Sequence, residues 1–301
     1  MKQLFFAILI LFATGISAQQ TQLYSLYMLH DFACNPAVAG TDDFLKTQIN
    51  KRYQFLGIQD APSTTSYSVH GNLENLSMGW GGMIYKDTHG AFSKFGAYAA
   101  YAYRIALDAR TNISFGLNLG LINYKVDATS LTALQEEVNF DFAKYSYIRP
   151  DATAGIYIKS KDYFGGIAVD QLFNNKIELI EDANAAKNTI SRLKSHYSIM
   201  AGYIYKLSYG FTFEPTVVIR KAALTPLQVE ATARAVYNKT AWAGVGIRTS
   251  DAVTLLIGYN YQKTMYFAYA YDITYSSLRK DSFGSHEIIL GIRFPEPFLN
   301  L

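Results

Sequence analysis

The stretch TMYFAYAYDITY, Thr264–Tyr275, shows the pattern that decides the fold. Large apolar or aromatic side chains occupy its odd-numbered positions, from Met265 to Tyr275, and its even-numbered positions are mostly small or polar. Successive side chains of a β-strand point to opposite faces of the sheet, so this alternation predicts a strand with one apolar face. The same period of two recurs in residues 110–124, 209–220, 226–238 and 284–294.

Composition narrows the class of protein. Of the 301 residues, 24 are Tyr and 19 are Phe, and charged residues make up 17%, against about 25% in ordinary soluble domains. A net charge of +3 without a basic run argues against nucleic acid as a partner. The single cysteine, Cys34, excludes an intramolecular disulfide framework, and the five His residues lack the spacing of a metal site, so we expect no cofactor. The aromatic excess suggests a surface that faces something other than water.

Fourteen runs with a period of two follow one another along the chain. They cover residues 45–55, 64–72, 78–87, 92–107, 110–124, 151–160, 162–170, 196–207, 209–220, 226–238, 239–249, 252–261, 263–275 and 284–294. In hydrocarbon every backbone N–H and C=O needs a partner, so strands cross a bilayer only as a closed sheet. An even number of strands of about ten residues is typical of outer-membrane barrels. We therefore predict an all-β fold, a transmembrane antiparallel β-barrel of about 14 strands in the bacterial outer membrane.

The lengths of the connections support the barrel independently. If the barrel begins and ends on the periplasmic side, every second connection is expected to be short. These connections fall near residues 73–77, 108–110, 161, 208, 238–239 and 262–263. The opposite set contains the two long segments Lys125–Pro150 and Gln171–Ser195. A soluble β-sandwich also alternates, but it rarely places charges such as Glu230 and Arg234 on a face inside its core.

Aromatic side chains gather near the strand ends on the apolar face. We expect them to form girdles at the level of the lipid headgroups. The residues concerned are Tyr101, Tyr103, Tyr203, Tyr205, Tyr259, Tyr261 and Tyr275.

The N-terminal part of the chain divides into two predicted segments. Residues 1–18 read as a secretory signal peptide, with Lys2 before an apolar stretch and small residues at the exit. This stretch is shorter than the roughly 20 residues that a spanning helix needs. Residues 19–43 do not alternate, yet they are rich in apolar side chains, so we expect them to pack in the lumen or at the periplasmic mouth. The barrel then covers residues 44–294, and residues 295–301 form a C-terminal tail.

The polar face of the predicted strands points into the lumen and carries ten charged side chains. They are Arg52, Arg104, Glu214, Arg220, Glu230, Arg234, Arg248, Asp272, Glu287 and Arg293. One interpretation is that they form ion pairs that fill and stiffen the lumen, because buried charges need partners. The other is that they line a pore or bind a partner.

Signals for catalysis are weak. Ser66, Ser68 and His70 share one strand face, but neighbours on a face do not by themselves make a nucleophile with its base and orienting group. The glycines of Gly79–Gly82 are not followed by a predicted helix, so strand bends or close packing explain them better than a phosphate-binding loop. We expect no enzymatic activity.

Several segments resemble a known family. They are Tyr24–Met28 (YSLYM), Asn35–Gly40 (NPAVAG), Gln54–Gly57 (QFLG), Ala61–Thr65 (APSTT), Tyr101–Ile105 (YAYRI) and Gly284–Phe294 (GSHEIILGIRF). Together they resemble the PorP/SprF family of membrane proteins of type IX secretion and gliding motility. The resemblance extends over essentially the whole chain after the signal peptide.

The resemblance implies a non-catalytic outer-membrane barrel that binds, helps to export or anchors a partner surface protein. The expected partner is an adhesin-like client with a C-terminal sorting domain, besides other type IX components and outer-membrane lipid. A channel or transporter for small solutes is the alternative. Long loops on a rigid scaffold are natural contact surfaces. Candidate partner-binding residues are Asn35, Pro36, Gly40, Arg52, Arg104, Glu230, Arg234, Arg293, Glu178, Glu181 and Arg192.

Overall fold

The predicted all-β barrel is confirmed by a computed structural model, which describes residues 22–73, 77–127, 144–178, 190–192, 194–222 and 225–295. Fourteen antiparallel strands form a closed barrel. In chain order the strands are β1 Phe44–Tyr53, β2 Ser63–Asn72, β3 Met78–His89, β4 Phe92–Ala106, β5 Asn112–Asp127, β6 Lys144–Lys159, β7 Tyr163–Asp170, β8 Lys176–Glu178, β9 Ile190–Arg192, β10 His196–Tyr203, β11 Tyr205–Lys206, β12 Phe211–Ala222, β13 Gln228–Tyr237, β14 Ala241–Arg248, β15 Ala252–Tyr261, β16 Met265–Thr274 and β17 Ser285–Pro295.

Each barrel strand pairs with its neighbours in sequence, and two pairings complete the ring. β1 pairs with β17, and β10 pairs with β12 as well as with β7. The short β11 continues β10 after Ile204 and pairs with the start of β12. β8 and β9 form a separate two-stranded hairpin. No helix in the described part of the chain is long and apolar enough to cross a membrane.

Strand β6 begins earlier than the sequence pattern predicts. It starts at Lys144 instead of residue 151, and it pairs with β5 as far as Asp127. The predicted loop ended at Pro150, because the alternation was counted from residue 151. Proline cannot donate a hydrogen bond to a central ladder. In the structure Pro150 pairs only with β5, because the pairing of β6 with β7 covers Ala154–Lys159. The proline therefore lies where the strand has one neighbour, and this is where a sheet tolerates it.

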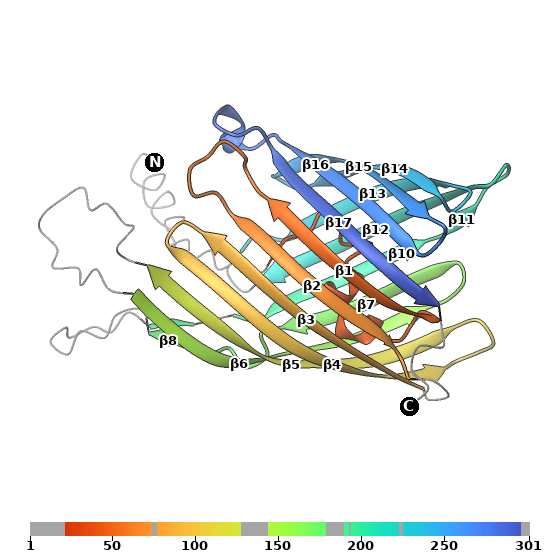
Figure 1. Ribbon diagram of the computed structural model, residues 1–301, viewed down its shortest axis with the longest axis horizontal. Helices are drawn as coiled ribbons and strands as arrows, with labels where there is room; N and C mark the ends of the chain where they lie inside the picture. Colours follow the sequence, from red (N-terminus) through yellow and green to blue (C-terminus); the bar gives the residue numbers. More distant parts are fainter. Residues whose placement is uncertain are drawn as a thin grey trace, which may run out of the picture.

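The two ends of the barrel differ in their connections. Short turns join the strands at the end where β1 begins and β17 finishes, on the right in Figure 1, and the longer connections lie at the other end. In two of the turns both central residues have positive φ, at Asn238-Lys239 and Gln262-Lys263, as tight hairpins require. At a third turn the N–H groups of Arg110 and Thr111 donate to the Asp108 carboxylate, which lowers the pKa of Asp108. We refer below to the turn end and the loop end.

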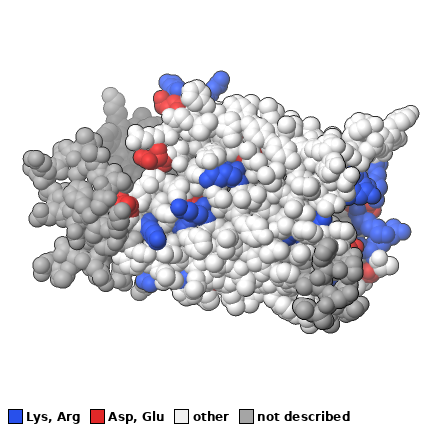
Figure 2. Space-filling view, in the orientation of Figure 1, with Lys and Arg blue, Asp and Glu red and all other residues white. Residues whose placement is uncertain are grey.

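The outer wall of the barrel is apolar and aromatic. The girdle tyrosines all point outward, among them Tyr101 and Tyr261, which are 48% and 53% exposed. In the face shown by Figure 2, an almost uncharged band separates the Lys and Arg residues of the loop-end half from those gathered at the turn end. Such a surface fits hydrocarbon rather than water.

Residues 22–43 run through the lumen from one end of the barrel to the other. Leu23 lies at the loop end beside Gln54, Thr225 and Asp251. The segment then forms the short helices α2 (Asp31–Cys34) and η1 (Pro36–Val38), which pack on the inner faces of β2 and of β4, β5 and β6, and it leaves at the turn end to enter β1 (Figure 1). We call residues 22–43 the luminal segment. The proposed signal peptide lies outside the described residues, as do residues 296–301 of the proposed tail.

Glycines in the barrel wall allow the luminal segment to approach the strands closely. A Cβ atom at Gly79 would overlap the backbone of Ala39, and one at Gly155 would overlap the side chain of Asn35. Gly40 itself has a φ of +71°, which favours glycine, and packs against Gly79. Close packing is therefore the role of Gly79.

We predict that Gly79→Ala loosens the luminal segment, because the new methyl group displaces the backbone at Ala39. The expected cost is about 1–3 kcal/mol, read as a lower unfolding temperature and faster proteolysis of the luminal segment. Gly82→Ala in the same strand is the control, since its Cβ would meet no atom closer than 3.6 Å. Equal behaviour of the two variants would refute the packing role.

Candidate functional site

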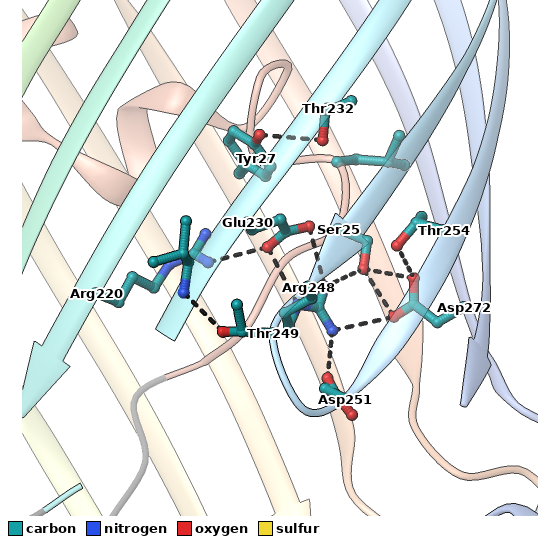
Figure 3. A network of polar contacts seen from close by, with 12 residues as sticks. Ser25, Tyr27, Arg220, Glu230, Thr232, Arg248, Thr249, Asp251, Thr254 and Asp272 are labelled. Carbon is teal, nitrogen blue, oxygen red and sulfur yellow. Dashed lines mark hydrogen bonds and ion pairs between the residues drawn. The ribbon is translucent and has the colours of Figure 1, made fainter. Parts of the chain in front are cut away.

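The hydroxyl group of Ser25 is the centre of a buried polar network at the loop end of the lumen (Figure 3). Its Oγ accepts hydrogen bonds from Arg52 Nη1 at 2.8 Å and from Arg248 Nη2 at 2.7 Å. The same hydroxyl lies 2.8 Å from both carboxylate oxygens of Asp272, to which it can donate. The backbone N–H of Ser25 donates to Glu287 Oε2 at 2.6 Å. One serine of the luminal segment thus contacts four charged side chains of the barrel wall.

The charged side chains around Ser25 also pair with one another. Arg52 lies 2.6 Å from Asp272 and 3.0 Å from Glu287, and Arg248 lies 3.1 Å from Glu230. The side chains of all five residues are at most 2% exposed. Removing such charges from water is costly, and several hydrogen bonds to each ion are needed to offset the cost. Ser25 supplies a share of those bonds, to Arg52, Arg248, Asp272 and Glu287.

The network extends along the lumen wall from Glu230. Arg220 donates to Glu230 at 3.0 Å, and its guanidinium group lies over the Tyr27 ring at 5.4 Å. The Tyr27 hydroxyl lies 3.1 Å from Thr232 Oγ1 and donates to it. Leu26 and Tyr27 are fully buried, so this turn of the luminal segment contributes apolar contacts as well as polar ones. Arg248 also lies 3.4 Å from Asp272, and Asp251, at the loop end, adds a third carboxylate at 2.7 Å.

His30 anchors the middle of the luminal segment. Its Nε2 lies 2.9 Å from Ser66 Oγ, and its Nδ1 contacts the Gln48 side chain. Nearby, Lys46 donates to the Leu29 carbonyl at 2.7 Å. Sequence reasoning missed this group because His30 lies in a segment without strand periodicity.

Ser66 and His70, which share a strand face in the sequence, do not have each other as partners in the structure. Ser66 contacts His30, whereas the His70 ring stacks on Phe32 at 4.7 Å between centroids. Ser66, His70 and His30 are at most 2% exposed, beneath the luminal segment. The contacts of these side chains are therefore those of buried, packed groups.

Asn35 clamps the second half of the luminal segment. Its Nδ2 donates to the carbonyl groups of Ile156 and Ile167 at 3.0 and 3.1 Å, and its Oδ1 accepts the Ala37 N–H that begins η1. An asparagine suits this position because its one side chain bonds to both β6 and β7 and caps η1. Pro36 follows as the first residue of η1 and is buried.

At the turn end two further side chains fix the luminal segment. Arg104 donates to the Gly40 carbonyl at 2.7 Å, and Lys159 pairs with Asp42. Among the candidates proposed from sequence, Asn35, Pro36, Gly40, Arg52 and Arg104 therefore meet at the contact between segment and barrel. Glu230 bonds to Arg220 and Arg248 of the wall beside it.

The remaining candidates are placed elsewhere. Arg234 pairs with Glu214 and lies over the Trp242 ring at 4.9 Å. Arg293 lies over Tyr266 at 4.4 Å and donates to Asn260. The backbones of Glu178 and Arg192 belong to the hairpin β8–β9, whereas Glu181 lies outside the described residues.

The described residues offer no group of three or more His, Cys, Asp or Glu side chains that could hold a metal ion.

The motifs on which the family resemblance rests converge on this lumen. Tyr24–Met28 supplies Ser25, Asn35–Gly40 supplies the clamp, Tyr101–Ile105 supplies Arg104 and Gly284–Phe294 supplies Glu287. A model of the type IX secretion system membrane protein PorP/SprF matches residues 16–292. The chain belongs to the PorP/SprF family. The resemblance found in the motifs is thereby confirmed, and this PorP/SprF protein is an outer-membrane barrel associated with type IX secretion.

Solved structures similar to this PorP/SprF protein are outer-membrane barrels. A FadL homologue from Pseudomonas aeruginosa is 11% identical over 87% of this chain and 92% of the other, with a TM-score of 0.50. The P. putida toluene transporter TodX is 9% identical over 88% and 93%, with a TM-score of 0.47. A KdgM porin is 7% identical over 84% and 99%, with a TM-score of 0.41. The first likeness supports the barrel fold. No curated protein sequence matches the chain.

We predict that Arg52→Met strongly destabilises the barrel, because it leaves Asp272 and Glu287 short of a partner in a buried site. The expected loss is about 3–5 kcal/mol. Lys206→Met is the matched control, since the Lys206–Asp162 pair is 66% and 44% exposed and such pairs contribute about 1 kcal/mol or less. Denaturant titration measures the free energy of unfolding of both variants. A decrease of similar size in the two variants would contradict the role of the network.

Proposed function

We propose that this PorP/SprF protein is a non-catalytic subunit that binds a type IX client, an adhesin-like surface protein with a C-terminal sorting domain, and helps to export or anchor it. The observation that carries the proposal is the luminal segment, held at Ser25, His30, Asn35 and Gly40 along the length of the barrel. A lumen occupied by its own chain leaves less room for a solute pathway, and this supports binding of a partner over conduction.

The loop end is the proposed contact surface. The long connections within Lys125–Pro150 and Gln171–Ser195 both belong to this end, and the hairpin β8–β9 lies within the second. The second loop carries acidic and basic residues in its sequence, so charge matching to a client gives a basis for selectivity. Gliding motility is proposed as one process that such a client would serve.

The absence of catalysis is part of the proposal. It is supported by the burial of Ser66 and His70 beneath the luminal segment and by their separate partners, His30 and Phe32. A nucleophile that contacts neither substrate nor solvent has no reaction to start.

Replacing Gln171–Ser195 with the corresponding loop of another family member is expected to abolish retention of one client, because the contact surface changes while the barrel remains. Surface display of the client and copurification under mild detergent measure this. Replacing the turn at residues 207–210, at the opposite end, is the control and should leave retention unchanged. Normal client retention after the loop exchange would refute the proposed surface.

Deleting residues 22–30 removes Ser25 and His30 and is expected to lower the unfolding temperature and weaken client binding. In planar bilayers the full-length protein should be silent, and the deletion should conduct, since the lumen loses its filling. Steady conductance by the full-length protein would favour a solute channel instead. Unchanged heat stability and client binding after the deletion would show that the luminal segment is not required.

A further inference from the structure

A small cavity lies between the luminal segment and the strands β3 to β7, β10 and β12. It has a volume of about 90 Å³, room for a few water molecules, and Cys34 and Asn35 of the luminal segment form one side. His196 and Arg220 line both this cavity and the larger one at the mouth of the loop end, so the two adjoin. We call the small cavity the side chamber.

Three oxygen atoms in the side chamber have no hydrogen-bond partner within the described ranges. They are Asp151 Oδ1, Asn118 Oδ1 and Gln171 Oε1, and each belongs to a side chain at least nine-tenths buried. Buried polar atoms nearly always have partners, so each orphan needs an explanation. Here all three are acceptors, which points to a ligand that supplies positive charge or donors.

The charges of the side chamber also favour a positively charged ligand. Asp151 receives a hydrogen bond from the Tyr98 hydroxyl at 2.8 Å on its other oxygen, but that bond adds no positive charge. Asp170 also lines the chamber, and neither aspartate has an ion pair within the part of the chain that the structure describes. Arg220 is the guanidinium group in the lining, and it is already paired with Glu230 at 3.0 Å. Buried carboxylates are normally paired or coordinate metals.

We propose that the side chamber binds a hard divalent cation of the Ca²⁺ class. The lining offers two carboxylates, two amide oxygens and the Thr153 hydroxyl, which are the oxygen ligands that Ca²⁺ takes, completed by water. Two carboxylates balance the charge of one divalent ion. The site belongs to strands β5, β6 and β7 and to the residue that follows β7, so a bound ion ties the wall of the barrel together beside the luminal segment.

The test uses the full-length protein purified in detergent and stripped of metal with a chelator. Titration calorimetry with Ca²⁺ should show one site per chain, and Ca²⁺ should raise the unfolding temperature more than Mg²⁺, Na⁺ or K⁺ does. Parallel titration with butylammonium tests an organic cation in place of the metal. The absence of Ca²⁺ binding, or binding of butylammonium alone, would overturn the proposal.

Three variants locate the site. Asp151→Asn is expected to weaken Ca²⁺ binding by about tenfold or more, and Asn118→Leu, which removes an oxygen without changing the charge, should weaken it as well. Asp60→Asn, in an exposed loop at the same end, is the control and should bind normally. If Asp151→Asn fails to fold, the Ca²⁺ affinity of Asn118→Leu still tests whether the side chamber is the binding site. Normal Ca²⁺ affinity in Asn118→Leu together with higher stability would show that the chamber holds water only.

Discussion

The closure of the strand ring is the constraint from which the rest of the structure follows. In hydrocarbon no backbone N–H or C=O can remain unpaired, so β1 must meet β17 and β10 must meet β12. Closure turns the apolar face of each strand toward lipid and the polar face inward. A lumen lined by polar side chains then has to hold water or protein, and here residues 22–43 occupy it.

The charged groups in the lumen define the position of the luminal segment more than they add stability. The free energy lost when Arg52, Arg248 and their carboxylate partners leave water cancels much of the free energy gained from their attraction. An apolar filling would serve stability equally well, but it would tolerate a shift along the lumen. A serine hydroxyl that must reach two guanidinium groups and one carboxylate has only one suitable position. The network therefore selects one register of the segment, as buried polar groups do in other packed cores.

The sequence predicts the barrel well because its signal is local. A period of two is visible in each run, and the strand expected at residues 263–275 is observed at Met265–Thr274. The luminal segment is different. Its conformation is set by contacts with strand residues that lie 15 to 262 positions away, such as Lys46 with Asp31 and Ser25 with Glu287. One serine among many carries no local signal. The charges of the lumen could be assigned to a face from the sequence, but their partners depend on strand register and tilt.

The contact between Ser25 and the barrel lies on the seam between the first and last strands. Arg52 of β1 and Glu287 of β17 face each other across this pairing, and Ser25 bonds to both. These strands are far apart in sequence, so joining them carries a larger loop-closure cost in entropy than joining the two strands of a hairpin. The luminal segment directly precedes β1, and its own position is therefore tied to that strand. By bonding to both sides of the seam, it stabilises the pairing that closes the ring, so the filling of the lumen and the closure of the wall support each other.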